Sequence, residues 1–227
     1  MRRTAMTAIA ALVLAAAPAR AQVLGLPVYN SGVTSGISLN ADYGFVSVDP
    51  GSAKAKTLGL TGGLALGPLG VTATYASLNP ETGDNQSSVG ATANLKVFGG
   101  PLIPISVNAQ LGLGYWQDKD FFGPGLDRKN VNIPVGLGIA LNVPTPGLSI
   151  KPWIAPRMQY TRTSGNVDDS QTNFGISAGV NLGLVGGING RFAYDQITYD
   201  VGATEVKYKV FSVGLGFNFN IPVVPGI

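Results

Sequence analysis

Apolar and polar residues alternate strictly over residues 211–220, FSVGLGFNFN. Successive side chains of a strand point to opposite faces, so this pattern predicts a strand with one apolar face and one small or polar face. The same alternation recurs along the chain, and no segment beyond the N-terminal region shows the 3.6-residue period of an amphipathic helix. The pattern predicts strands at residues 36–46, 57–67, 71–78, 88–98, 105–116, 131–143, 150–162, 173–185, 188–196 and 206–221.

The connections between these strands alternate between two kinds. Short, nearly uncharged turns follow the second, fourth, sixth and eighth strands, and longer polar loops follow the odd-numbered ones. Short turns at one end and long loops at the other are typical of up-and-down outer-membrane barrels. The chain is therefore predicted to form a single all-β antiparallel barrel of ten strands. Eight strands is the alternative, because the first and ninth patterns are the weakest.

Tyrosines mark one level of the predicted barrel, near the ends of the strands that lead into the long loops. An aromatic ring with a hydroxyl suits the boundary between hydrocarbon and headgroups, which predicts an aromatic girdle. The alternative is the ordinary preference of tyrosine for strands, but this preference does not explain why the tyrosines gather at one end. The predicted girdle consists of Tyr43, Tyr75, Tyr115, Tyr160, Tyr194 and Tyr208.

The scarcity of charge indicates which face meets water. Charged residues are 12% of the chain, about half the usual share of soluble domains. A soluble barrel of lipocalin type, secreted or periplasmic and binding an apolar ligand, would need a well-charged exterior, and the polar faces here carry mainly Ser, Thr, Asn, Gln and Gly. The apolar faces are therefore predicted to point outward into lipid, where closed barrels satisfy every backbone group.

The N-terminus predicts export. Arg2 and Arg3 precede an apolar run, and Ala19-Arg20-Ala21 supplies the small residues of a cleavage site, so residues 1–21 are predicted to be a signal peptide. Its removal leaves 12 basic and 12 acidic residues, and a neutral mature chain gives no reason to expect nucleic-acid binding. The predicted organisation continues with a periplasmic segment at 22–35, the barrel at 36–221 and a C-terminal tail at 222–227.

The closing strand resembles the signal that the outer-membrane insertion machinery reads. That signal has a polar residue, a glycine two positions later and two apolar or aromatic residues, here Ser212, Gly214, Phe217 and Phe219. The chain thus resembles the small outer-membrane β-barrel proteins of bacteria, which are porin-like or structural. The resemblance implies location in the cell outer membrane, contact with its lipid and lipopolysaccharide, assembly by the insertion machinery, and a monomer. Family members usually end at the final aromatic residue, whereas eight residues follow Phe219 here.

The sequence argues against catalysis, because it contains neither histidine nor cysteine. Barrel enzymes of the resembling families rely on a histidine, so no enzyme, cofactor or metal site is expected. The stretch 118–123, DKDFFG, starts like a calcium loop, but Phe122 and Lys129 stand where oxygen ligands are required.

Continuing the alternation places charged residues inside the barrel, together with Trp116 and Trp153. A charge in a narrow lumen must be paired or hydrated, and Arg157 has the reach to meet either Asp42 or Asp195. Two functions are compatible with this interior: a structural barrel with a narrow, polar, largely filled lumen, or a small-solute, porin-like channel. The predicted lumen charge network is Asp42, Lys96, Lys151, Arg157, Arg191 and Asp195.

Overall fold

The computed structural model describes residues 23–32, 36–50, 53–81, 83–99, 103–119, 127–165, 168–201 and 204–219. Strands occupy most of these residues, and none of them forms a helix long and apolar enough to span a membrane. The elements are β1 (Gly36–Asp49), β2 (Lys54–Leu66), β3 (Leu69–Pro80), β4 (Gln86–Phe98), β5 (Ile105–Lys119), β6 (Asp127–Leu141), β7 (Val143–Thr145), β8 (Leu148–Gly165), β9 (Asp169–Leu184), the 3-10 turn η1 (Val185–Gly187), β10 (Ile188–Val201) and β11 (Thr204–Phe219).

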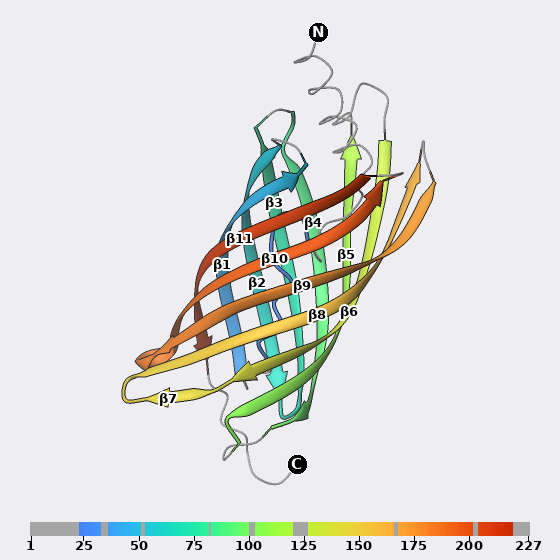
Figure 1. Ribbon diagram of the computed structural model, residues 1–227. Helices are drawn as coiled ribbons and strands as arrows, with labels where there is room; N and C mark the ends of the chain where they lie inside the picture. Colours follow the sequence, from blue (N-terminus) through green and yellow to red (C-terminus); the bar gives the residue numbers. More distant parts are fainter. Residues whose placement is uncertain are drawn as a thin grey trace.

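The strands form one closed antiparallel barrel (Figure 1). Each long strand pairs with its neighbour in the sequence, and β1 closes the ring by pairing with β11. The three-residue strand β7 pairs only with the start of β8, and beyond it β8 pairs directly with β6. Within the described residues the barrel thus has ten long strands, which confirms the ten-strand prediction over the eight-strand alternative.

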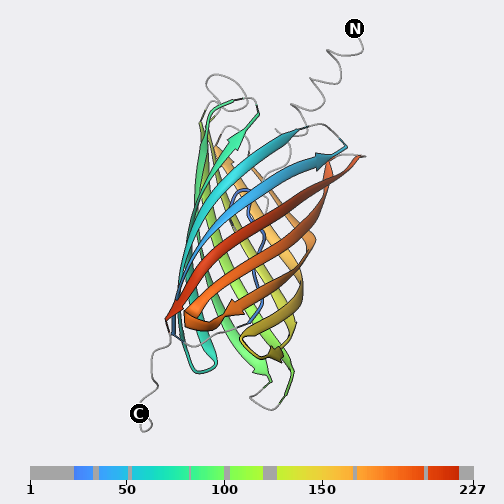
Figure 2. The same ribbon diagram turned by 90° about the vertical axis from the view of Figure 1, so that its left-hand side faces the viewer.

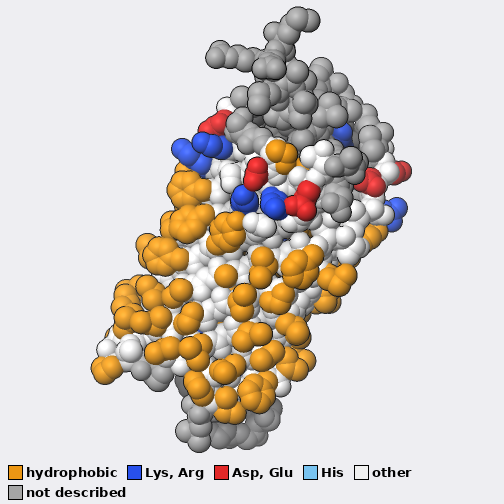
Figure 3. Space-filling view, viewed as in Figure 1, with side chains coloured by type: hydrophobic (Ala, Val, Ile, Leu, Met, Phe, Trp, Pro, Cys, Tyr) orange, Lys and Arg blue, Asp and Glu red, His pale blue; other side chains and the backbone are white. Residues whose placement is uncertain are grey.

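The two ends of the barrel differ as the connections predicted. We call the end with short connections, such as Gly67–Pro68 and η1, the turn end, and the opposite end the loop end. Between them, the outward positions of every long strand carry large apolar side chains, for example Leu60, Leu137 and Leu215. Figure 3 shows this apolar surface below a belt of charged side chains at the loop end. Such a surface suits hydrocarbon, and the soluble, inward-apolar barrel is wrong.

The two faces exchange character near the loop end. In β11, outward Phe211 is followed toward the loop end by outward Lys209, while inward Ser212 is followed by inward Val210. β1 and β10 change in the same way, with inward Val48 and Ile197 buried. Polar-out and apolar-in is the pattern of a barrel in water, so these strands continue past the apolar band.

A segment of chain runs inside the barrel (Figure 2). Residues 23–32 have no regular secondary structure, yet Leu24, Leu26 and Val28 are fully buried. The prediction of a periplasmic segment at 22–35 is therefore wrong for the described part of it. Its apolar side chains fill space among the inward faces of the strands, which removes them from water. The predicted signal peptide at 1–21 and the tail at 222–227 lie outside the described residues, and β11 is described to Phe219.

Candidate functional site in the barrel lumen

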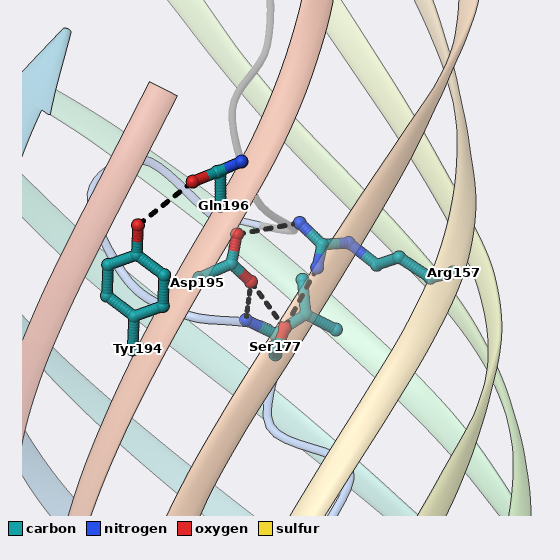
Figure 4. Close-up of polar contacts among 6 residues, drawn as sticks. Arg157, Ser177, Tyr194, Asp195 and Gln196 are labelled. Atoms are coloured by element: carbon teal, nitrogen blue, oxygen red, sulfur yellow. Dashed lines mark hydrogen bonds and ion pairs between the residues drawn. The ribbon is translucent and has the colours of Figure 1, made fainter. Parts of the chain in front are cut away.

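A buried ion pair joins two strands along the inner wall of the barrel at mid-height (Figure 4). Arg157, on β8, donates to Asp195, on β10, with 2.8 Å between Nη2 and Oδ1, and both side chains are buried. Ser177, on the intervening strand β9, accepts a hydrogen bond from Arg157 Nη1 at 2.8 Å and donates its own hydroxyl to Asp195. The second carboxylate oxygen also accepts the backbone N–H of Val28 at 3.1 Å. The carboxylate is therefore satisfied by three donors, which a buried charge requires.

A second ion pair lies nearer the turn end. Arg191, on β10, binds Asp42, on β1, in a bidentate arrangement through Nε and Nη2. The hydroxyl of Tyr29 lies 3.0 Å from the same carboxylate and 2.7 Å from Ser212 Oγ. The guanidinium of Arg191 stacks over the Tyr29 ring, with Cζ 3.9 Å from the ring centroid. This stacking adds a cation–π contact to the pair.

Residues 23–32, which we call the internal segment, are thus attached through two consecutive residues to the carboxylates of both ion pairs, Asp195 and Asp42. Val28 binds Asp195 through its backbone, and Tyr29 binds Asp42 through its side chain. Further hydrogen bonds hold the segment along its length: Ser88 accepts from the Leu24 N–H, and Gln110 donates to the Tyr29 carbonyl at 2.8 Å. Sequence analysis missed these residues. The signal that could have found them is the apolar run VLGLPVYN at 23–30, which a water-exposed linker does not need.

Glycines in the wall make room for this segment. An ideal Cβ on Gly44 would overlap the carbonyl oxygen of Gly25, and one on Gly138 would overlap the carbonyl oxygen of Asn30. Both obstacles are backbone atoms, which cannot move aside as a flexible side chain can. Inward glycines therefore allow the chain to lie directly against the wall.

The loop-end part of the lumen is apolar on one side, whereas buried Gln86, Asp118, Asn130 and Thr163 make it polar on the other. On the apolar side the buried side chain of Leu24 packs with inward residues of the wall: Val46, Val48, Leu78, Trp116, Ile197, Tyr199, Val206, Tyr208 and Val210. The polar interior that was expected is therefore interrupted by an apolar cluster on one side of the loop end. Tyr208 was predicted in the outer girdle, and this prediction is wrong, because Tyr208 has the same parity as inward Ser212 and is 1% exposed.

The other five predicted girdle tyrosines, Tyr43, Tyr75, Tyr115, Tyr160 and Tyr194, are exposed on the outer face. The hydroxyl of Tyr75 lies 2.9 Å from Ser87 Oγ, and that of Tyr194 donates to Gln196 at 3.0 Å. Ser87 and Gln196 belong to the loop-end ends of their strands, where the outer surface becomes polar. These hydroxyls therefore point out of the apolar band, as residues at an interface do.

The residues of the predicted insertion signal divide between the two faces. Ser212 and Gly214 face the lumen, where an ideal Cβ on Gly214 would overlap Asp42. Phe217 and Phe219 face outward, with their ring centroids 4.5 Å apart. Gly214 thus has a packing role beside the second ion pair in the folded barrel.

The two lysines of the predicted charge network stand apart from the ion pairs. Lys96, on β4, and Lys151, on β8, are half-buried and lie toward the turn end. Lys151 lines a cavity of about 350 Å³ between the internal segment and the turn end. Trp153, two residues along β8, is buried against Tyr29, with 6.2 Å between ring centroids.

Comparisons with known proteins agree with this architecture. No curated protein matches the sequence. Among solved structures, the chain is similar to the beta domain of the Bordetella autotransporter BrkA, with 14% identity and a TM-score of 0.50 over 82% of this chain and 100% of that one. It is also similar to Neisserial surface protein A, with 17% identity and a TM-score of 0.39 over 82% of this chain and 98% of that one. The family described as "Outer membrane protein beta-barrel domain" matches residues 7–219. The chain therefore belongs to that family and is an integral β-barrel of the outer membrane.

Proposed function

We propose that this protein is a structural outer-membrane barrel whose lumen is closed by its own N-terminal segment. The observation that carries the proposal is the path of residues 23–32, which run through the lumen and bind both of its carboxylates. At mid-height the segment binds Asp195, and the Arg157–Asp195 pair and Ser177 lie beside it on the inner wall. The apolar cluster around Leu24 occupies one side of the loop-end part, where an ion would lose part of its hydration.

The proposal includes no catalytic step, because the chain has no histidine or cysteine to serve as base or nucleophile. It describes a monomer, because the barrel closes on itself through β1 and β11. The charged belt at the loop end, which includes Asp49 paired with Lys209 at 3.1 Å, is the surface proposed to meet lipopolysaccharide headgroups.

Conductance in planar lipid bilayers tests the closed lumen. The intact mature protein is expected to show little or no conductance. A variant that lacks residues 22–32 is expected to show stable openings, because the space that the segment fills becomes continuous with the turn-end cavity. A matched control replaces these residues with a Gly/Ser sequence of equal length, which cannot fill the lumen and is expected to conduct as well. A large, steady conductance of the intact protein would overturn the proposal.

A further inference from the structure

Among the described residues, the middle and turn-end parts of the lumen carry more positive than negative charge. The two acids there, Asp42 and Asp195, are each bound to an arginine, which leaves Lys96 and Lys151 as additional cations. Within the part of the chain that the structure describes, neither lysine forms a salt bridge. The other ten acidic residues of the sequence belong to its loop-end segments. Among the described residues, no carboxylate is thus left over to neutralise the two lysines.

Both lysines lie close to Asn108 and Gly32, and the positive charge of Lys96 acts on Lys151. Lys96 is paired in register with Asn108, on β5, and Asn108 lies beside Gly32 of the internal segment. An ideal Cβ on Gly32 would lie 2.7 Å from Asn108 Nδ2 and 3.2 Å from Lys151 Nζ, so these two donors converge on one point. Like charges gathered in a half-buried place are unfavourable unless an anion joins them.

Unsatisfied polar atoms surround the same place. Asn108 is fully buried, yet neither its Nδ2 nor its Oδ1 has a partner among the described residues. Gly138, on β6, pairs in register with Asn108, and Asn30 of the internal segment lies over Gly138. Asn30 is 2% exposed, and neither its Nδ2 nor its Oδ1 has a partner among the described residues. Buried amides are rarely left without hydrogen bonds, so a group absent from the chain itself is expected to meet them. The adjoining cavity has room for a small anion together with bridging water.

We infer that this place is a binding site for a small oxyanion that carries a phosphate or carboxylate group. Lys96 and Lys151 supply the charge, the Nδ2 groups of Asn108 and Asn30 supply neutral donors, and the asparagine oxygens accept from bridging water. The site lies on the turn-end side of the internal segment, and short turns are periplasmic in outer-membrane barrels. The anion therefore enters from the periplasm, and its binding does not require the lumen to conduct.

Titration calorimetry of the detergent-solubilised mature protein tests the site, with inorganic phosphate and succinate as separate probes in chloride buffer of constant ionic strength. We expect saturable binding of at least one probe, and the probe that binds identifies the class as phosphate or carboxylate. Lys151→Gln and Lys96→Gln are each expected to weaken binding tenfold or more. The control Lys56→Gln, near the loop end, is expected to leave the affinity unchanged.

Folding of each variant is checked by its heat-dependent shift on a denaturing gel. Thermal unfolding of the unmodified protein gives a readout that needs no variant: the binding anion should raise the unfolding temperature above that in chloride of equal ionic strength. Absence of saturable binding of both probes up to about 10 mM would overturn the inference, because weaker binding corresponds to less than about 3 kcal/mol. Equal affinity in the folded double variant K96Q/K151Q would overturn it as well.

Discussion

The charged residues of the lumen form ion pairs whose two members are far apart in the sequence. Arg157 and Asp195 are 38 positions apart, and Arg191 and Asp42 are 149 positions apart. Each carboxylate accepts an additional hydrogen bond from the internal segment, so neither ion is left unsatisfied. The alternation of each strand was enough to predict that these side chains face inward. It could not predict the partners, because these depend on how the strands are staggered around the closed barrel.

Arg157→Ala is expected to lower the free energy of unfolding by about 3–5 kcal/mol, because it leaves Asp195 charged and buried without its cation. It is also expected to raise conductance, since it opens a void beside the internal segment. The measurements are urea-induced unfolding in detergent and bilayer recording. The control Arg162→Ala removes an exposed arginine from the same strand and should change stability by less than about 0.5 kcal/mol. Equal stability of the two variants would contradict the role assigned to the ion pair.

At the scale of elements, the strands are longer at the loop end than the sequence pattern predicted. β10 was predicted to end at 196 and continues to Val201, and β6 was predicted to begin at 131 and begins at Asp127. On β10 the physical reason is the exchange of faces described above: the apolar-out pattern ends with the apolar band, but backbone pairing continues in water with apolar residues inside. On β6 both faces become polar instead, with Asn130 inside and Lys129 outside, so the alternation ends although the pairing continues. The prediction of Tyr208 as an outer residue failed in the same region.

The exchange of faces predicts where the membrane boundary lies. Arginine in place of Leu137, an outward residue of β6 within the apolar band, should cost about 2–4 kcal/mol of folding free energy. Arginine in place of Asn79, an exposed residue beyond Tyr75 on β3, should cost about 0–1 kcal/mol. Unfolding in lipid vesicles measures both values. A cost at Asn79 as large as that at Leu137 would place the boundary farther toward the loops than the exchange of faces indicates.

At the scale of the whole molecule, the barrel and its contents form a single unit. The internal segment connects strands on opposite sides of the lumen, through Ser88 on β4, Asp195 on β10 and Gln110 on β5. The charged loop end and the apolar band give the molecule a direction relative to the membrane (Figure 3). By the rule for outer-membrane barrels, the loop end is extracellular and the turn end is periplasmic.

Cysteine labelling tests this direction, and because the sequence contains no cysteine, each introduced cysteine is the only site that can be labelled. In intact cells, a membrane-impermeant maleimide should label Asp84→Cys, which is exposed at the loop end. It should not label Val185→Cys, which is exposed in η1 at the turn end, until the outer membrane is permeabilised. The parent protein, which has no cysteine, is the control for background. Labelling of position 185 but not 84 in intact cells would show the opposite orientation.

The sequence by itself determined the class of fold and the outward direction of the apolar faces, and it favoured ten strands over eight. Each of these depends on local information: the two-residue period within a strand and the length of each connection. Only the tertiary structure decided that residues 23–32 enter the lumen, which arginine meets which acid, and that Lys96 and Lys151 form no salt bridge within the described residues. These features depend on contacts between segments far apart in the sequence, which form only when the barrel has closed and its register has brought the inward faces together.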